Sequence, residues 1–180
     1  NVYNLVTKRA LVEENGTMEW IDGNIGSKKT MKYPCCVLKG DNSKGTCITI
    51  SVATTNQHQD SGARMIHVGK NTESSIISKS IAKCGGKADF RGEIRIEKEA
   101  DNSSSIVKCD TLILDEKSSS DAFPIDTVKN KKSNIEHEAT VSKISEEKLF
   151  YLMSRGLSEE EAIDLVVLGF TEEFKKELPM

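Results

Sequence analysis

The chain has 180 residues, of which 37% are hydrophobic and 29% are charged, and its formal net charge is −3 at pH 7. Such values are typical of a globular protein with one sizeable core and room for a smaller appendage. The lysines form small local clusters rather than a broad basic stripe, so we expect no nucleic-acid partner. No apolar run approaches the ~20 residues of a membrane-spanning helix, so we expect no membrane partner.

The cysteines indicate a reducing environment. The sequence has five of them, with no C-x-x-C pair and no histidine at zinc-finger spacing. They are Cys35, Cys36, Cys47, Cys84 and Cys109. Single thiols inside apolar runs suit a compartment that keeps thiols reduced, so we expect neither a disulfide framework nor structural zinc. The cytoplasm or a plastid-type organelle matrix is the predicted location.

Residues 30 to 128 consist of short runs rich in Ile, Val and Thr, separated by Gly, Asn, Asp and Ser, as in "GTCITISVAT" and "SSIVKCDTLIL". Successive runs start roughly 10 to 15 residues apart, and no helical apolar period lies between them. This pattern excludes alternating strands and helices and leaves an all-β sandwich, a barrel or a β-solenoid. Small residues and a low aromatic content of 5% favour a solenoid, although no fixed repeat is visible.

The pattern becomes helical from Ser145. "SEEKLFYLMSRG" has Ser145 as a helix N-cap and Gly156 as a stop, and "SEEEAIDLVVLG" has a capping box at Ser158 and Glu161 with Gly169 as the stop. A third helix is predicted from Thr171 to Leu178. We therefore predict a β body over residues 1–144 and a helical tail over 145–180. Because the chain starts at Asn1 and stops directly after a helical pattern, we expect a truncated segment of a longer protein.

The stretch "NIEHEATVSK", residues 134–143, combines an imidazole with two carboxylates. In a strand, Glu136 and Glu138 share one face, about 7 Å apart at their Cα atoms, and His137 lies on the other face with the apolar residues. A histidine on an apolar face is more often a core residue than a ligand, so both interpretations of His137 remain open here. His67, in "MIHVG", alternates in the same way and is predicted to be a core residue.

Cys109 lies in the most apolar run, on one face with Val107 and Thr111, while Lys108 and Asp110 flank it on the other face. A buried free cysteine is usually a small hydrophobic residue, and this is the first interpretation of Cys109. The sequence lacks a phosphate-binding G-K-S/T loop, a G-x-S-x-G elbow and an H-E-x-x-H motif. A carbohydrate-active solenoid could use Glu136 and Glu138 as a carboxylate pair, but the scarcity of aromatic residues disfavours this.

Several stretches together resemble the SufB family, the scaffold subunits of the SUF iron–sulfur cluster assembly machinery. They are "YNLVTKRALVEENGTMEW", "KYPCCVLKG", "QHQDSGARMIHVGKNT", "SIISKSIAKCGGKADFRG", "VKCDTLILDEKSSSD", "IEHEATVSKISEEKLFYLMSRGLSEEEA" and "GFTEEFKKELPM". The match covers nearly the whole chain and corresponds to the C-terminal portion of the family. The paralogous SufD family has a Cys-Ser-His-Gly lead-in where this chain has residues 135–138, so SufB is the better match.

The resemblance implies a mainly β fold, a right-handed parallel β-helix followed by a small C-terminal helical region. It also implies that Cys109 accepts persulfide sulfur and that Glu136, His137 and Glu138 take part in assembling a nascent iron–sulfur cluster. Cys109, His137 and Glu138 are thus the expected metal ligands. Thiolate and imidazole are accepted ligands of such clusters, and a carboxylate suits the harder iron ion. Cys35, Cys36, Cys47 and Cys84 match no functional position of the family.

The leading hypothesis is therefore an assembly scaffold rather than an enzyme. The resemblance implies that ATPase activity resides in a SufC partner docked on the helical tail. Other implied partners are SufD or a second SufB copy, and a cysteine desulfurase with its sulfur-transfer proteins. The alternatives are a SufD-like scaffold without the sulfur-acceptor role and the carbohydrate-active solenoid. If His137 and Glu138 bind one ion, the alternation between faces predicts a bulge or bend in their strand.

Overall fold

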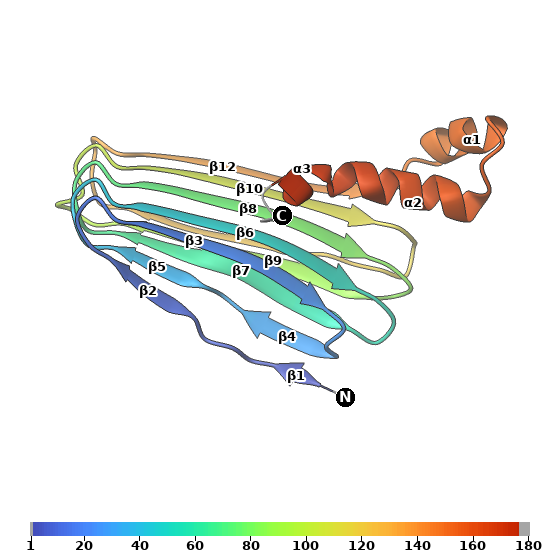
Figure 1. Cartoon of the computed structure of the whole chain (residues 1–180), viewed down its shortest axis with the longest axis horizontal. Coiled ribbons are helices and arrows are strands. Elements are labelled where there is room, and N and C mark those ends of the chain that lie inside the picture. The colour runs from blue at the N-terminus through green and yellow to red at the C-terminus, as the bar shows by residue number, and fades with distance from the viewer. Residues whose placement is uncertain (1, 177–180) are drawn as a thin grey trace.

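A computed structural model describes residues 2–176, in which two parallel β-sheets are wound into a solenoid and followed by a helical tail (Figure 1). The strands are β1 Tyr3–Asn4, β2 Arg9–Val12, β3 Thr17–Ile25, β4 Lys29–Lys32, β5 Cys35–Leu38, β6 Lys44–Ala53, β7 His58–His67, β8 Glu73–Ala82, β9 Lys87–Ile96, β10 Ser104–Ile113, β11 Ala122–Val128 and β12 Asn134–Lys143. The helices are α1 Glu146–Ser154, α2 Glu159–Phe170 and α3 Glu172–Lys176. The predicted parallel β-helix with a C-terminal helical region is confirmed.

Each coil of the solenoid adds to both sheets. Sheet B has the order β12-β10-β8-β6-β3, and sheet A contains β1, β2, β4, β5, β7, β9 and β11, with every neighbouring pair parallel. Equivalent residues on successive coils are 27, 29 and 31 positions apart, as the bonded pairs Asn15–Asn42, Asn42–Asn71 and Asn71–Asn102 illustrate. This uneven spacing explains why no fixed repeat is visible in the sequence.

The same turn is repeated on four successive coils. Asn15, Asn42, Asn71 and Asn102 all have a positive φ, which asparagine tolerates better than most residues. Their side-chain amides bond to one another from coil to coil over 3.1, 3.3 and 3.4 Å. This asparagine ladder keeps the coils in register at one end of the strands.

Within the predicted β body, the sequence pattern marked no individual strand before residue 30 or over β11. β3 has Asp22 and Asn24 among its inward residues, both nearly fully buried, and these polar residues mask the alternation. β11 contains Pro124 and is exposed over most of its length, because it belongs to the last coil. In both cases pairing with a neighbouring coil, rather than the local sequence pattern, determines that a strand forms.

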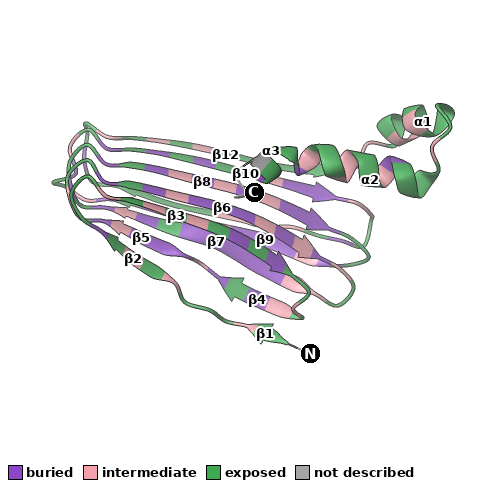
Figure 2. Ribbon diagram, viewed as in Figure 1, coloured by how far each residue is buried: buried purple, intermediate pink, exposed green. Residues whose placement is uncertain are grey.

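Buried residues recur along the strands of both sheets (Figure 2), and they include an apolar cluster and a set of small polar side chains. The main cluster includes Leu38, Met65, Ile76, Phe90, Ile94 and Val107. Small hydroxyl side chains occupy inward positions of sheet B. They are Thr49, Ser51, Ser78, Ser80 and Thr111, all at most 2% exposed. Cys109 lies between these two parts of the interior.

The helical tail extends from the end of β12 and returns to sheet B. Ser145 caps α1, and Ser158 with Glu161 forms the predicted capping box of α2. Gly169, which was predicted to stop α2, lies inside the helix, because the hydroxyl of Thr171 bonds to the carbonyls of Val167 and Leu168 and ends the helix one residue later. The third predicted helix corresponds to α3, and residues 177 and 178 of that prediction lie outside the described residues.

The tail contacts sheet B through its last turns. The ammonium of Lys79 on β8 lies 5.0 Å from the ring of Phe170 on α2 and 2.6 Å from the carboxylate of Asp110 on β10. Phe174 of α3 is buried, and α3 contacts β6. In contrast, α1 has no buried residue and lies beyond the ends of the strands (Figure 1). Within residues 2–176 no helix has the length and apolar character needed to cross a bilayer.

His67 is a core residue, as predicted. Its side chain is fully buried, with Nδ1 2.7 Å from Thr72 Oγ1 and Nε2 2.8 Å from Ser74 Oγ. Burial lowers the pKa of His67 to about 4, and the hydrogen bond at Thr72 offsets only part of this effect. The imidazole is therefore neutral in the folded protein over most of the pH range.

We predict that His67 makes the fold sensitive to acid. Between pH 6.5 and about 4 the unfolded chain binds a proton at this position and the folded chain does not, so stability falls as the pH falls through this window. The loss reaches up to about 3 kcal/mol. Urea unfolding of the wild type and His67→Gln at pH 7.5 and 4.5 measures it, with His58→Gln as a control. Equal losses in wild type and His67→Gln would contradict this assignment.

Candidate functional site

Cys109 lies on β10 with its side chain inside the solenoid. It is in register with Ser78 on β8 and Ala139 on β12, and it is only 1% exposed. Lys108 and Asp110 lie on the opposite, outward face, as the alternation predicts. The thiol is therefore separated from solvent by the wall of β8, β10 and β12.

The environment of Cys109 favours the neutral thiol. Burial raises the pKa of Cys109 to about 12, and the charge of Asp110 acts in the same direction. The hydroxyls of Thr111 and Ser78 stabilise the thiolate and offset part of this increase. Reaction at this sulfur therefore requires a cation or a proton acceptor beside it.

His137 lies on the same inner face as Cys109, one coil further along. It is in register with Val107, and its side chain is 13% exposed, whereas Glu136 and Glu138 are exposed. The sequence prediction that His137 lies with the apolar residues is confirmed. Its Nδ1 lies 3.1 Å from Oδ2 of Asp126, which comes from β11 in the other sheet.

Cys109 and His137 lie on the same inner face of neighbouring strands. They are two positions apart in register, which puts their Cα atoms about 8 Å from each other. Thiolate sulfur and imidazole nitrogen are donor types of iron–sulfur and zinc sites. The inner face of β10 and β12 is thus the candidate site.

The predicted bulge at His137 and Glu138 is wrong. β12 pairs with β10 without interruption from Asn134 to Lys143, so the two-residue alternation is preserved. Glu138 is in register with Lys108 on the outer face, away from His137. The two glutamates lie on an exposed edge strand, whereas a glycosidase pair flanks its substrate in a cleft.

A second group of possible ligands lies on the outer face of sheet A. His58, Asp60 and Asp89 bring one ligand atom each within 4.8 Å of one another. However, Arg91 Nε is 2.9 Å from each carboxylate oxygen of Asp60, and Lys87 and His58 both pair with Asp89. Because cations already neutralise both carboxylates, we interpret this group as a network that links β7 and β9. Sequence reasoning missed it because its members are one coil apart.

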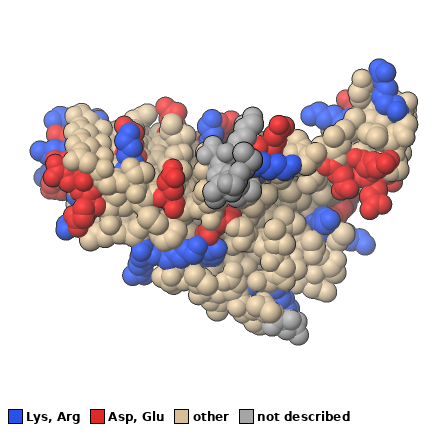
Figure 3. All heavy atoms as spheres, in the orientation of Figure 1, with Lys and Arg blue, Asp and Glu red and all other residues tan. Residues whose placement is uncertain are grey.

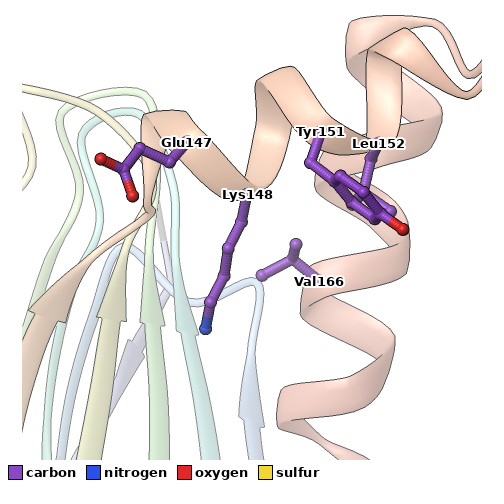
Figure 4. A pocket seen from close by; sticks show the side chains of 5 residues that line it. All are labelled: Glu147, Lys148, Tyr151, Leu152 and Val166. Carbon is purple, nitrogen blue, oxygen red and sulfur yellow. The ribbon is translucent and has the colours of Figure 1, made fainter.

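The helical tail provides a third candidate surface. A groove between α1 and α2 is lined by Glu147, Lys148, Tyr151, Leu152 and Val166 (Figure 4). Next to it, Phe150 is 75% exposed, and Leu165 and Leu168 are about half exposed. Acidic residues gather where α2 begins, while charges of both signs are interspersed elsewhere on the face in Figure 3. An exposed apolar surface of this kind is typical of a protein–protein contact.

The fold is a parallel β-solenoid with a cysteine and a histidine on the inner face of its last coils. Residues 1–170 match the protein family described as "SUF system FeS cluster assembly, SufBD core domain". The chain therefore belongs to the SufBD core family of the SUF iron–sulfur cluster assembly system, and the resemblance seen in the sequence is confirmed.

Individual proteins of this family are similar to the chain over its full length. Over all 180 residues the chain is 59% identical to the iron–sulfur cluster assembly protein SufB of Bacillus subtilis (strain 168). It is 59% identical to a SufBD family protein of Staphylococcus saprophyticus and 58% identical to one of Staphylococcus aureus (strain USA300). The chain spans 39% of the length of each of these relatives.

We predict that Gly92 on β9 makes room for the ring of Phe90. A β-carbon at this position would lie 2.9 Å from Cε1 of Phe90, so Gly92→Ala displaces that ring, whereas its distance of 3.6 Å from Cε1 of His137 is an ordinary van der Waals contact. The expected cost is roughly 1–3 kcal/mol of unfolding free energy, measured with guanidinium chloride. Gly23→Ala, where no atom lies within 4 Å, is the control. Equal stability of the two variants would show that the site tolerates the extra carbon.

Proposed function

We propose that this chain is the part of a SufB-type scaffold that accepts persulfide sulfur at Cys109 and holds a nascent iron–sulfur cluster with His137. The observation that carries this proposal is the position of a thiol and an imidazole on one inner face of adjacent coils. Membership of the SufBD core family supports it. Buried thiols suit a reducing compartment such as the cytoplasm.

Sulfur transfer to Cys109 is a thiol exchange. The Cys109 thiolate attacks the outer sulfur of a donor persulfide, R–S–SH, and a new S–S bond forms at Sγ. The S–S bond of the donor breaks, and the donor leaves with the electron pair as the thiolate R–S⁻. The product is Cys109–S–SH, and no net oxidation or reduction occurs.

The raised pKa of Cys109 determines what must precede this step. Because burial keeps the thiol neutral, a cation close to Sγ is needed to favour the thiolate. Iron held by His137 can supply that charge, since a coordinated thiol loses its proton. A basic group of a docked partner is the other source. A cysteine desulfurase with its sulfur-transfer proteins is the proposed donor of the persulfide.

The glutamates act from the outer face in this proposal. Glu136 and Glu138 are exposed on β12, where their carboxylates can bind incoming iron, the harder ion, before it reaches the thiol. Because one thiol and one imidazole leave a cluster short of ligands, a second subunit, SufD or another SufB copy, is proposed to complete the set. The edge strand β12, which pairs only with β10, is open to such a subunit.

The helical tail is the proposed docking surface for the ATPase SufC. The sequence has no phosphate-binding loop of its own, so nucleotide chemistry is assigned to the partner. Phe150, Tyr151 and the groove between α1 and α2 offer exposed apolar side chains that a partner can bury. Residues 145–180 thus serve docking and residues 1–144 serve assembly.

We predict that Cys109→Ser abolishes persulfide acceptance by the full-length scaffold. Sulfane sulfur bound after incubation with a cysteine desulfurase and L-cysteine is measured by mass spectrometry. His137→Ala should lower the iron content after anaerobic reconstitution and slow sulfur acceptance, because the iron that His137 holds favours the Cys109 thiolate. Cys47→Ala, which removes another fully buried inward thiol, is the matched control. Wild-type sulfur loading of Cys109→Ser would overturn the acceptor role.

We predict that Phe150→Asp weakens binding of the ATPase subunit. Removing a 75% exposed phenyl ring that a partner buries should cost at least tenfold in Kd, since interface aromatic residues typically contribute about 2 kcal/mol or more. Ile25→Asp, at a 71% exposed apolar residue of β3, is the control. Isothermal titration with the purified ATPase measures both. Unchanged affinity for Phe150→Asp would exclude this surface.

A further inference from the structure

The solenoid register determines which carboxylates can reach the inner site. Glu136 and Glu138 point away from it, because β12 stays in register with β10 along its whole length. On β11, Asp126 is in register with Ile94 of β9, a fully buried core residue, so Asp126 lies on the inner face. Phe123, which stacks under Arg91 at 4.2 Å, marks the outer face of the same strand.

Asp126 is the carboxylate that contacts His137. Its Oδ2 lies 3.1 Å from Nδ1, and this contact joins β11 of sheet A to β12 of sheet B in the last coil. Within residues 2–176 no lysine or arginine forms an ion pair with Asp126, in contrast to Asp60, which is held by Arg91. The charge of Asp126 is thus directed at the imidazole.

The contact selects one form of the imidazole. When Nδ1–H donates to Asp126, the lone pair of the neutral ring is on Nε2, which is then the nitrogen that can bind a metal. Metal-binding histidines almost always donate their other N–H to a carboxylate or carbonyl, and this partner orients the ring. Gly92 faces the ring from β9, where a β-carbon would lie 3.6 Å from Cε1 of His137.

We propose that Asp126 is the positioning residue of the inner site, which holds the His137 ring in the Nδ1–H tautomer and leaves the lone pair of Nε2 available to a metal. This inference rests on the proposed role of His137 as an iron or cluster ligand and deepens it. Asp126 acts through His137 and need not contact the iron. The carboxylate that supports the inner site therefore comes from β11 and not from the stretch of β12 that contains Glu136 and Glu138.

The tautomer is tested in the iron-free, full-length protein. Long-range ¹H–¹⁵N correlation spectra of the histidine-labelled protein, with the His137 signals assigned by their loss in His137→Ala, distinguish Nδ1–H from Nε2–H. The wild type and Asp126→Asn, which keeps an oxygen acceptor, should show Nδ1–H. Asp126→Ala should show a mixture or the Nε2–H form. An unchanged Nδ1–H signal in Asp126→Ala would overturn the proposal.

Iron binding is tested separately by anaerobic titration of Fe²⁺ against a competing chelator. Asp126→Ala should weaken binding by roughly 10- to 100-fold, and Asp126→Asn by less. Asp121→Ala is the control, because it removes an exposed carboxylate paired with Lys87 just before β11. If Asp126→Asn keeps the tautomer and binds as weakly as Asp126→Ala, Asp126 is a direct ligand and the positioning role is wrong.

The two proposals can fail independently. If His137→Ala binds Fe²⁺ as well as the wild type, the proposed function of His137 fails, whatever the tautomer measurements show. If His137→Ala loses Fe²⁺ binding while Asp126→Ala keeps both the tautomer and the affinity, only the role of Asp126 fails.

Discussion

The in-register stacking of parallel coils is the constraint on which the rest of the structure depends. Each inward position of sheet B lies directly beside its equivalent on the neighbouring coils, so side chains form rows along the axis. One row runs Asp22, Thr49, Ser78, Cys109 and Ala139. The adjacent row runs Trp20, Cys47, Ile76, Val107 and His137. Residues far apart in sequence thus become direct neighbours, and any shift of register would separate them.

The rows also explain why the site lies at the end of the stack. In the middle coils, inward positions are covered on both sides and hold apolar or small polar side chains, such as Ile76 and Ser78. The last coil has a neighbour on one side only, so His137 keeps part of its side chain accessible. Cys109, one coil further in, is covered and its pKa is raised to about 12. In the proposed function, the thiol stays neutral until a cation reaches it, and His137 holds that cation.

Much of this could be predicted from alternation within single strands. The inward positions of Cys109, His137 and His67 follow from it, while the helix caps at Ser145 and Ser158 follow from separate capping patterns. No sequence repeat distinguished the solenoid from a sandwich, so composition alone favoured the solenoid. The repeat is hidden because the coils differ in length by up to four residues and the inward polar residues of β3 interrupt the alternation. Asp126 and Gly92 could not be predicted, since they reach the site from the opposite sheet, which only the three-dimensional register reveals.

The predicted bulge in β12 is absent for a physical reason. The same reason affects how a nascent cluster is held in the proposed function. A bulge would bring His137 and Glu138 onto one ion but would break the pairing of β12, an edge strand whose strand partner among the described residues is β10. With the pairing intact, Cys109 and His137 lie on the inner face of β10 and β12, and both glutamates of β12 lie outside. In the proposed function, this ligand set is too small to retain a cluster permanently. An incomplete set at an open edge then suits a scaffold that releases what it assembles, because separating the proposed subunits removes ligands without unfolding the solenoid.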